Sequence, residues 1–225
     1  MELKSVVPWG RKLDEYKEMF SLSNIDLERK ILGCGDGPAS FNSELAEFGG
    51  NVVSIDPIYQ FSVEEIRSRI DTVYPEVMSQ VEKNKDNYIW KNIANVEELG
   101  KARMETMEKF LSSYSSGKRL GKYVNASLPK LPFGDKKFEL ALCSHYLFLY
   151  SEHVNQIEHL LSVKELCRVA KEVRIYPLLA LDGSKSKHLE PIMSSLEGSG
   201  FNVSLEHVKY QFQKGATEMM VVKNV

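Results

Sequence analysis

A short apolar run, a glycine-rich turn and a second apolar run that ends in a carboxylate constrain the fold of this chain more than any other stretch. Residues 31–32 lead directly into Gly-Cys-Gly-Asp-Gly at 33–37, and the second run, 52–55, ends at Asp56. Glycines let the backbone turn sharply and approach a ligand closely, because they carry no Cβ atom. The order of strand, glycine loop, helix, strand and acid predicts a β-α-β unit that binds a nucleoside.

The helix after the glycine loop and the spacing to Asp56 sharpen this prediction. The loop leads into a helix that is expected to begin at Pro38 and to be closed by the glycines at 49–50. Asp56 follows Gly35 by 21 residues, the distance at which such units place the acid that accepts hydrogen bonds from ribose hydroxyls. The dinucleotide pattern G-x-G-x-x-G fails in either register, because its third glycine position falls on Ser40 or on Pro38. This argues against a nicotinamide-dependent reductase.

Gly35, Gly37 and Ala39, followed by Asp56, resemble motifs I and II of the class I S-adenosylmethionine-dependent methyltransferases. The resemblance implies S-adenosyl-L-methionine as the cofactor, with Asp56 on its ribose. That family usually carries an acid two residues before the first of these glycines, where it helps hold the methionine amino group, but this chain has Gly33 there. A non-catalytic protein that binds the cofactor or S-adenosylhomocysteine is therefore a second hypothesis.

The second half of the chain continues the resemblance. A strand expected at 123–126, a loop through Phe133 and a strand at 138–144 are similar to the family's passage across the adenine pocket. Ser127 stands where the family often has an acid for the adenine amino group, and Leu128 is placed to contact the adenine ring. The cofactor-binding residues that the resemblance implies are Gly33, Cys34, Gly35, Gly37, Asp56, Pro57, Ser127, Leu128 and Ser144.

The segment 58–119 is long for a crossover between two parallel strands and is predicted to be a helical insertion. A capping box at 62–65 is followed by apolar residues at helical spacing, and a second helix is expected from Asn95 to about Gly117. The aromatic stretch at 88–93 between the helices is too apolar for a free linker. We interpret the insertion as a cap over the active site, with a helical pair without a function at the site, or a dimer surface, as the alternatives.

The order of elements predicts an α/β fold in a single methyltransferase domain spanning 1–225. We expect a Rossmann-like, doubly wound, mainly parallel seven-stranded sheet with a C-terminal antiparallel hairpin and a helical insertion after strand 2. Before the sheet, apolar residues at helical spacing over 13–20 predict a short amphipathic helix that ends at 23–24.

His145 and Tyr146 are the candidate catalytic residues, because the strand at 138–144 delivers them to the edge where parallel sheets bind ligands. Histidine is the side chain best suited to take a proton near neutral pH, and Tyr146 is placed to orient an acceptor. The alternatives are a histidine that packs beneath the cap and a tyrosine that forms part of an apolar wall. Trp9, Arg11 and Tyr16 either close over the site as a lid or belong to a helix packed on the sheet edge.

The cysteines and histidines follow no pattern that favours a disulfide framework or a metal site. Cys34, Cys143 and Cys167 occupy apolar or motif positions, so a reduced compartment is expected and Cys34 is interpreted as a small structural residue. His153 and His159 stand six residues apart, which places them on different faces of a helix. No metal is expected.

The charge balance bears on the class of substrate. The formal net charge is −2, from 29 basic and 31 acidic residues, which supplies no global field for nucleic acid or anionic lipid. No apolar run reaches the roughly 18 residues of a membrane span, so a cytoplasmic location is expected. We therefore expect a methyltransferase that acts on a small-molecule acceptor, with an RNA methyltransferase as a further alternative and the oligomeric state, including a homodimer, left open.

Overall fold

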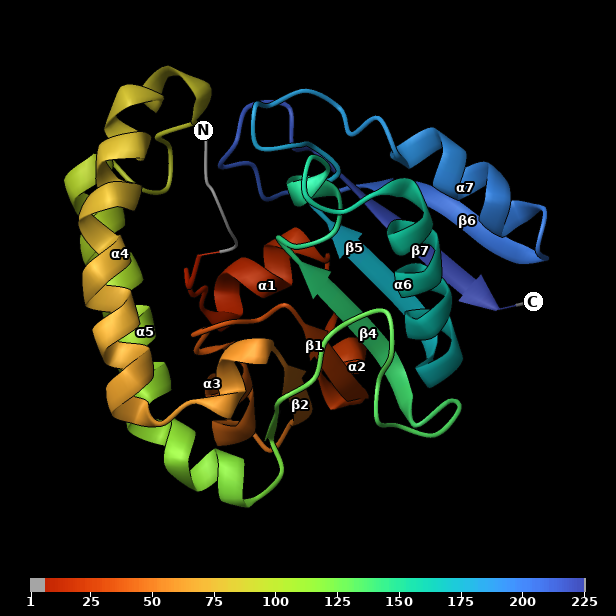
Figure 1. Cartoon of the computed structure of the whole chain (residues 1–225), viewed down its shortest axis with the longest axis horizontal. Coiled ribbons are helices and arrows are strands. Elements are labelled where there is room, and N and C mark those ends of the chain that lie inside the picture. Colours follow the sequence, from red (N-terminus) through yellow and green to blue (C-terminus); the bar gives the residue numbers. More distant parts are fainter. Residues whose placement is uncertain (1–6, 225) are drawn as a thin grey trace.

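The computed structural model describes residues 7–224 and builds them around one seven-stranded sheet (Figure 1). The strand order is β3-β2-β1-β4-β5-β7-β6; the first five strands run parallel, and β7 pairs antiparallel with both β5 and β6. The strands are β1 (Lys30–Cys34), β2 (Asn51–Ile55), β3 (Tyr123–Val124), β4 (Phe138–Ser144), β5 (Ala170–Tyr176), β6 (Phe201–His207) and β7 (Glu218–Asn224). The predicted fold class, a doubly wound sheet that closes in an antiparallel hairpin, is confirmed.

Helices cover both faces of the sheet, so the domain has three layers (Figure 1). Apolar residues of α1 (Leu13–Met19) and α3 (Phe41–Glu47) pack on one face, where Ile31 and Leu140 point. The other face, which includes Leu32 and Ala141, packs against α6 (Gln156–Val169) and α7 (Leu189–Glu197). The alternation of buried side chains along β1 and β4 therefore supplies both halves of the core.

The segment between β2 and β3 forms the expected pair of long helices, which stand beside the sheet (Figure 1). They are α4 (Val63–Lys83) and α5 (Val96–Arg119), preceded by the 3-10 helix η1 (Pro57–Gln60) and joined through η2 (Lys85–Asn87). The guanidinium of Arg103, on α5, donates two hydrogen bonds of 2.6 Å to the carboxylate of Glu15, on α1. Both side chains are buried, so this charged pair anchors the insertion to the core.

A contact between two distant segments, which we call the clasp (residues 87–90 and 212–214), closes the far end of the insertion. The rings of Tyr88 and Phe212 stack at 4.8 Å between centroids, and the Ile89 amide donates to the Phe212 carbonyl at 2.8 Å. The Lys214 amide donates to the Asn87 carbonyl at 2.9 Å. The aromatic stretch at 88–93 is therefore packed against the connection between β6 and β7, as its apolar character indicated.

Three predicted helix limits are wrong, each for a local reason. Ser23 does not end a helix but caps α2 (Asn24–Glu28), because its hydroxyl accepts from the Asp26 amide while the Asp26 carboxylate accepts from the Ser23 amide. Pro38 lies in the glycine loop, and α3 starts only after Ser40. Helix α5 runs to Arg119, where basic residues in its last turn suit the helix dipole.

Within residues 7–224, no helix combines the length and the apolar character needed to cross a membrane. In the same residues, no three His, Cys, Asp or Glu side chains gather in a group that could hold a metal ion.

Candidate active site

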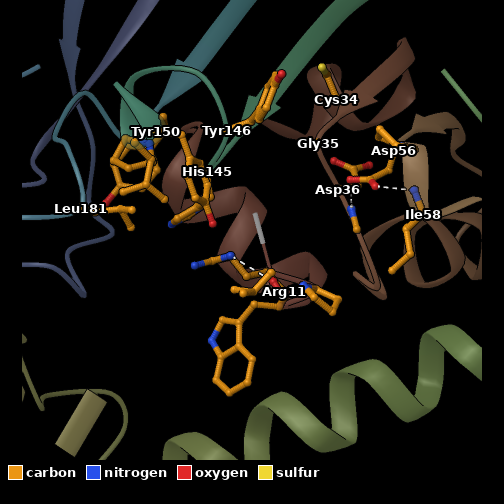
Figure 2. Close-up of a pocket in the computed structure, with 18 of the residues that line it drawn as sticks. Arg11, Cys34, Gly35, Asp36, Asp56, Ile58, His145, Tyr146, Tyr150 and Leu181 are labelled. Carbon is orange, nitrogen blue, oxygen red and sulfur yellow. Dashed lines mark hydrogen bonds between the residues drawn. The ribbon is translucent and has the colours of Figure 1, made fainter. Parts of the chain in front are cut away.

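A cavity of about 470 Å³ opens at the carboxyl ends of the parallel strands (Figure 2). It spans the ends of β1 and β4, which are neighbours in the sheet although far apart in sequence, so it lies at the topological switch point where open α/β sheets bind ligands. Its volume falls within the roughly 300–1,000 Å³ of small-molecule sites. Residues 7–9 and 11, together with parts of the insertion and of the clasp, complete its walls.

The glycine loop has a backbone that only glycine adopts easily. Gly35 and Gly37 have φ angles of +70° and +52°. A Cβ atom on Gly35 would lie 2.9 Å from the Cβ of Tyr146, at the end of β4. The loop therefore presses closely against β4 and leaves its outer side as a bare backbone surface toward the cavity.

Asp56 ends β2 with its carboxylate fixed by backbone groups. Oδ1 accepts from the Ile58 amide at 2.9 Å, and Oδ2 accepts from the Gly37 amide at 3.1 Å (Figure 2). Each oxygen keeps a lone pair for a ligand. Burial raises the pKa of Asp56 to about 6, although these two amide hydrogen bonds act to lower it.

A second carboxylate, Asp36, lies in the glycine loop and fills the space beside Gly33. A Cβ atom on Gly33 would lie only 1.9 Å from Asp36 Oδ2. The carboxylate accepts hydrogen bonds from the Tyr16 hydroxyl at 2.7 Å and the Ser54 hydroxyl at 2.5 Å. Burial, with a smaller contribution from the charge of Asp56, raises the pKa of Asp36 to about 7. The Asp36 carboxylate thus occupies the space that a side chain at position 33 would fill.

His145 follows β4 and lies across the cavity from the two carboxylates (Figure 2). Its φ angle of +50° is in the left-handed region that non-glycine residues rarely adopt, and such strain concentrates at functional sites. Nδ1 lies 3.0 Å from Ser144 Oγ. Burial, then the charges of Arg11 and Arg103, lowers the pKa of His145 well below its usual range. The imidazole is therefore neutral at neutral pH.

Two hydrogen bonds lie behind the residues that line the cavity. Ser144 Oγ lies 3.0 Å from His145 Nδ1, and the Tyr16 hydroxyl donates to Asp36 at 2.7 Å. When Ser144 Oγ accepts from Nδ1–H, Nε2 of His145 keeps its lone pair. We call Asp36 and Asp56 the carboxylate end of the cavity, and Arg11 and His145 the arginine end.

Comparison with known proteins places the chain in a family. No protein-family model matches it. An uncharacterised protein of Methanocaldococcus jannaschii, MJ0045, is 31% identical over 227 residues, which cover 99% of this chain and 98% of that protein. The chain belongs to the MJ0045 family.

Two solved structures resemble this MJ0045-family chain. The PH0226 protein of Pyrococcus horikoshii is 13% identical, with a TM-score of 0.50 over 94% of this chain and 91% of that one. At this identity the likeness concerns the fold alone. A putative S-adenosyl-L-methionine-dependent methyltransferase of Methanococcus maripaludis is 9% identical, with a TM-score of 0.48 over 95% of this chain and 83% of that one.

Most residues singled out in the sequence meet at the cavity of this MJ0045-family chain, but not all of them. Gly33 lies within β1 behind the Asp36 carboxylate, and Ser144 lies behind His145, so neither lines the cavity. Tyr16 is buried and stacks on Phe41 at 4.0 Å instead of closing over the site. The predicted residues that do line the cavity are Trp9, Arg11, Cys34, Gly35, Gly37, Asp56, Pro57, Ser127, Leu128, His145 and Tyr146.

Cys34 is part of this lining without the character of a nucleophile. A hydrogen bond with Cys143, followed by burial, raises the pKa of its thiol well above the usual range. The thiol therefore stays protonated, in agreement with the structural interpretation of this residue. Asp36 is a candidate functional residue that the motif in the sequence did not single out. The absence of an acid at position 33, together with the acid three residues later, could have indicated it.

Proposed function

We propose that this chain is an S-adenosyl-L-methionine-dependent methyltransferase that acts on a small-molecule acceptor. The observation that carries the proposal is the carboxylate end: two acids beside a bare glycine backbone, at the switch point of the sheet. When bound, the cofactor supplies a methyl group already activated on a sulfonium sulfur. The protein then has to bind, orient and, for a protonated acceptor, remove a proton.

The residues at the carboxylate end fit this cofactor. Asp56 keeps one lone pair on each oxygen for ribose hydroxyls, and Leu128 offers an apolar surface for the adenine ring. Asp36 would pair with the ammonium group of the methionine portion, in the role that the family's acid at position 33 usually has. Pairing with a cation favours the ionised carboxylate and so offsets the cost of burying Asp36.

His145 is proposed as the general base, and Tyr146 as the residue that orients the acceptor. A base must be unprotonated, which the lowered pKa of His145 favours. If Nδ1–H donates to the Ser144 hydroxyl, 3.0 Å away, Nε2 is left to accept the proton of the acceptor. Burial raises the pKa of Tyr146 to about 12, so its hydroxyl stays a hydrogen-bond donor. Both side chains line the cavity at the end of β4.

The segment 58–119 is proposed as a cap. Val77, Val81 and Leu99 of the helical pair line the cavity together with Tyr88 of the clasp. These side chains exclude water from the site, which strengthens the electrostatic interactions inside it. The ion pair between Arg103 and Glu15 fixes one part of α5 to the core, so any opening motion would centre on the clasp.

Calorimetric titration with S-adenosylhomocysteine tests the proposal. Asp56→Asn removes charge-assisted hydrogen bonds worth about 1.5–3 kcal/mol, so its affinity should fall about tenfold to a hundredfold. Asp71→Asn is the matched control, because Asp71 is exposed on α4 outside the cavity. Absence of binding to the wild type, or equal affinity in all three proteins, would overturn the cofactor assignment.

Transfer itself is tested by incubation with methyl-labelled cofactor and a metabolite pool. Label in a small molecule supports catalysis on such an acceptor. Label in added bulk tRNA instead would favour an RNA methyltransferase. Binding without any transfer of label would favour the non-catalytic alternative.

A further inference from the structure

The Arg11 side chain enters the cavity from the segment before α1 and carries a charge that the described residues do not neutralise. Figure 2 shows it reaching below His145, away from Asp36 and Asp56. Its Nη1 donates to the Trp9 carbonyl at 3.2 Å, and its buried Nε has no hydrogen-bond partner among residues 7–224. Within the same residues, no carboxylate lies within ion-pair distance of it.

Glu15 is the carboxylate whose charge affects Arg11, but its oxygens are already hydrogen-bonded to other side chains. Glu15 accepts two hydrogen bonds from Arg103 and one, at 2.9 Å, from the Tyr210 hydroxyl. Although burial acts to raise the pKa of Glu15, the charge and hydrogen bonds of Arg103 lower it to about 2, so the carboxylate is fully ionised and balances Arg103. The Glu15–Arg103 pair carries no net charge, so the positive charge of Arg11 next to it is not balanced.

A guanidinium that is largely shielded from water and has no carboxylate partner is costly, because arginine stays protonated and loses part of its hydration. Burial is the main cause that lowers the pKa of Arg11, and the charge of Arg103 adds to it. A ligand anion in the cavity would supply the missing charge and accept hydrogen bonds from the terminal Nη groups, of which Nη1 already donates to the Trp9 carbonyl. The planar fork of donors matches a carboxylate, which can accept two parallel hydrogen bonds.

We propose that Arg11 is the receptor for a carboxylate, and that this carboxylate belongs to the methyl acceptor. Arg11 provides one positive charge at this end, which suits one carboxylate better than a phosphate dianion. The cavity that Arg11 enters is also lined by Trp9, Leu149, Tyr150 and Phe212, so the acceptor is expected to combine a carboxylate with an apolar or aromatic body. This inference rests on the proposed function and names the substrate class for the same site.

The cofactor also carries a carboxylate, so the position of Arg11 has to separate the two sources. The charge of Arg11 acts on His145, Tyr150 and Tyr176, which line the ends of β4 and β5. Asp56, assigned to the ribose, lies at the opposite end (Figure 2). The geometry places Arg11 beside the proposed base and thus on the acceptor's side.

Binding of matched carboxylate and amide pairs tests the proposal in the protein saturated with S-adenosylhomocysteine. The pairs are benzoate, 4-hydroxybenzoate, phenylacetate and hexanoate, each with its amide. Ligand-observed NMR measures the binding of each compound. At least one carboxylate should bind the wild type tenfold or more tightly than its amide, and Arg11→Gln should abolish that preference. Arg67→Gln removes the same charge from the outer face of α4 and should keep it. No preference in the wild type, or one that survives in Arg11→Gln, overturns the proposal.

A second titration separates the two sources of carboxylate. S-adenosylhomocysteine has the amino-acid carboxylate, and 5′-methylthioadenosine lacks it. The acceptor assignment predicts that Arg11→Gln binds both about as tightly as the wild type. If only S-adenosylhomocysteine loses tenfold or more, the carboxylate at Arg11 is the cofactor's and the acceptor assignment fails. Failure of the wild type to bind either nucleoside would refute the proposed function itself, whereas the comparison of carboxylate with amide remains informative even if the variant does not fold.

Discussion

The carboxylate end and the arginine end of the cavity share one space but are built in opposite ways. Asp36 and Asp56 come from two consecutive strands and the loop between them, so 21 residues contain the whole arrangement. Arg11 and His145 come from segments 134 residues apart, which meet only because β1 and β4 are neighbours. Local sequence therefore specifies where the cofactor is expected, and the global fold specifies where the acceptor is expected.

The largest expected effect concerns the arginine end. His145→Gln should lower turnover by roughly 10²–10⁴, the usual contribution of a positioned base, and leave the affinity for S-adenosylhomocysteine unchanged. The measurement uses the acceptor found by the labelling experiment and normalises the rate to the folded fraction. His207→Gln, on the exposed strand β6, is the control. A folded His145→Gln protein with full turnover would remove His145 from the mechanism, and a lower melting temperature alone would make it structural.

The next effect concerns the pH dependence of stability at the carboxylate end. Because the pKa of Asp36 is raised to about 7, the folded protein holds a proton that the unfolded chain releases near pH 4. The free energy of unfolding should therefore fall as the pH rises from about 4 to about 7, by roughly 4 kcal/mol from this group. Asp36→Asn should lose this part of the decline and keep the part that comes from Asp56, whose pKa is raised to about 6, as measured by urea unfolding at several pH values. An identical pH profile in both proteins would contradict the assignment.

A smaller effect on the affinity for S-adenosylhomocysteine is expected when the acid is moved from position 36 to position 33. Gly33→Ala places a methyl group on the Asp36 carboxylate and should weaken S-adenosylhomocysteine binding about tenfold or more. The double variant Gly33→Asp with Asp36→Gly puts the acid where the family usually has it and should restore most of the affinity. If the double variant binds no better than Gly33→Ala although it is folded, Asp36 does not replace the family's acid.

The smallest expected effect concerns the cap. Trypsin should cut the free protein first between α4 and α5, near Lys85 and Lys91, and S-adenosylhomocysteine with a carboxylate from the panel should slow that cut several-fold. Cutting near Lys185, in the exposed loop before α7, is the internal reference. Equal rates with and without ligand would favour the alternative of a dimer surface for 58–119.

Hydrophobic periodicity and glycine spacing are local signals, so the sequence predicted the succession of strands and helices along the chain and the position of Asp56 after β2. It did not predict that the Asp36 side chain turns back over Gly33, since spacing reports which residues are near a loop but not which space each one fills. The same limit explains Gly33 and Ser144, which belong to the motif and to the strand end but lie behind the residues that face the cavity. Arg11 lacks a carboxylate partner because Glu15 pairs with Arg103. These two residues are 88 positions apart in the sequence, and no local pattern predicts their contact.

The clasp has a consequence for the rate of ligand exchange. Stacking of Tyr88 on Phe212 and two backbone hydrogen bonds join segments that both border the cavity. If 58–119 is the proposed cap, we expect ligand passage to require these contacts to break together. Association should then become independent of ligand concentration once opening is slower than encounter, and residence times should be long even for ligands of modest affinity. Phe212→Ala should shorten the residence time of a bound ligand, because the clasp would then no longer limit the rate of ligand release.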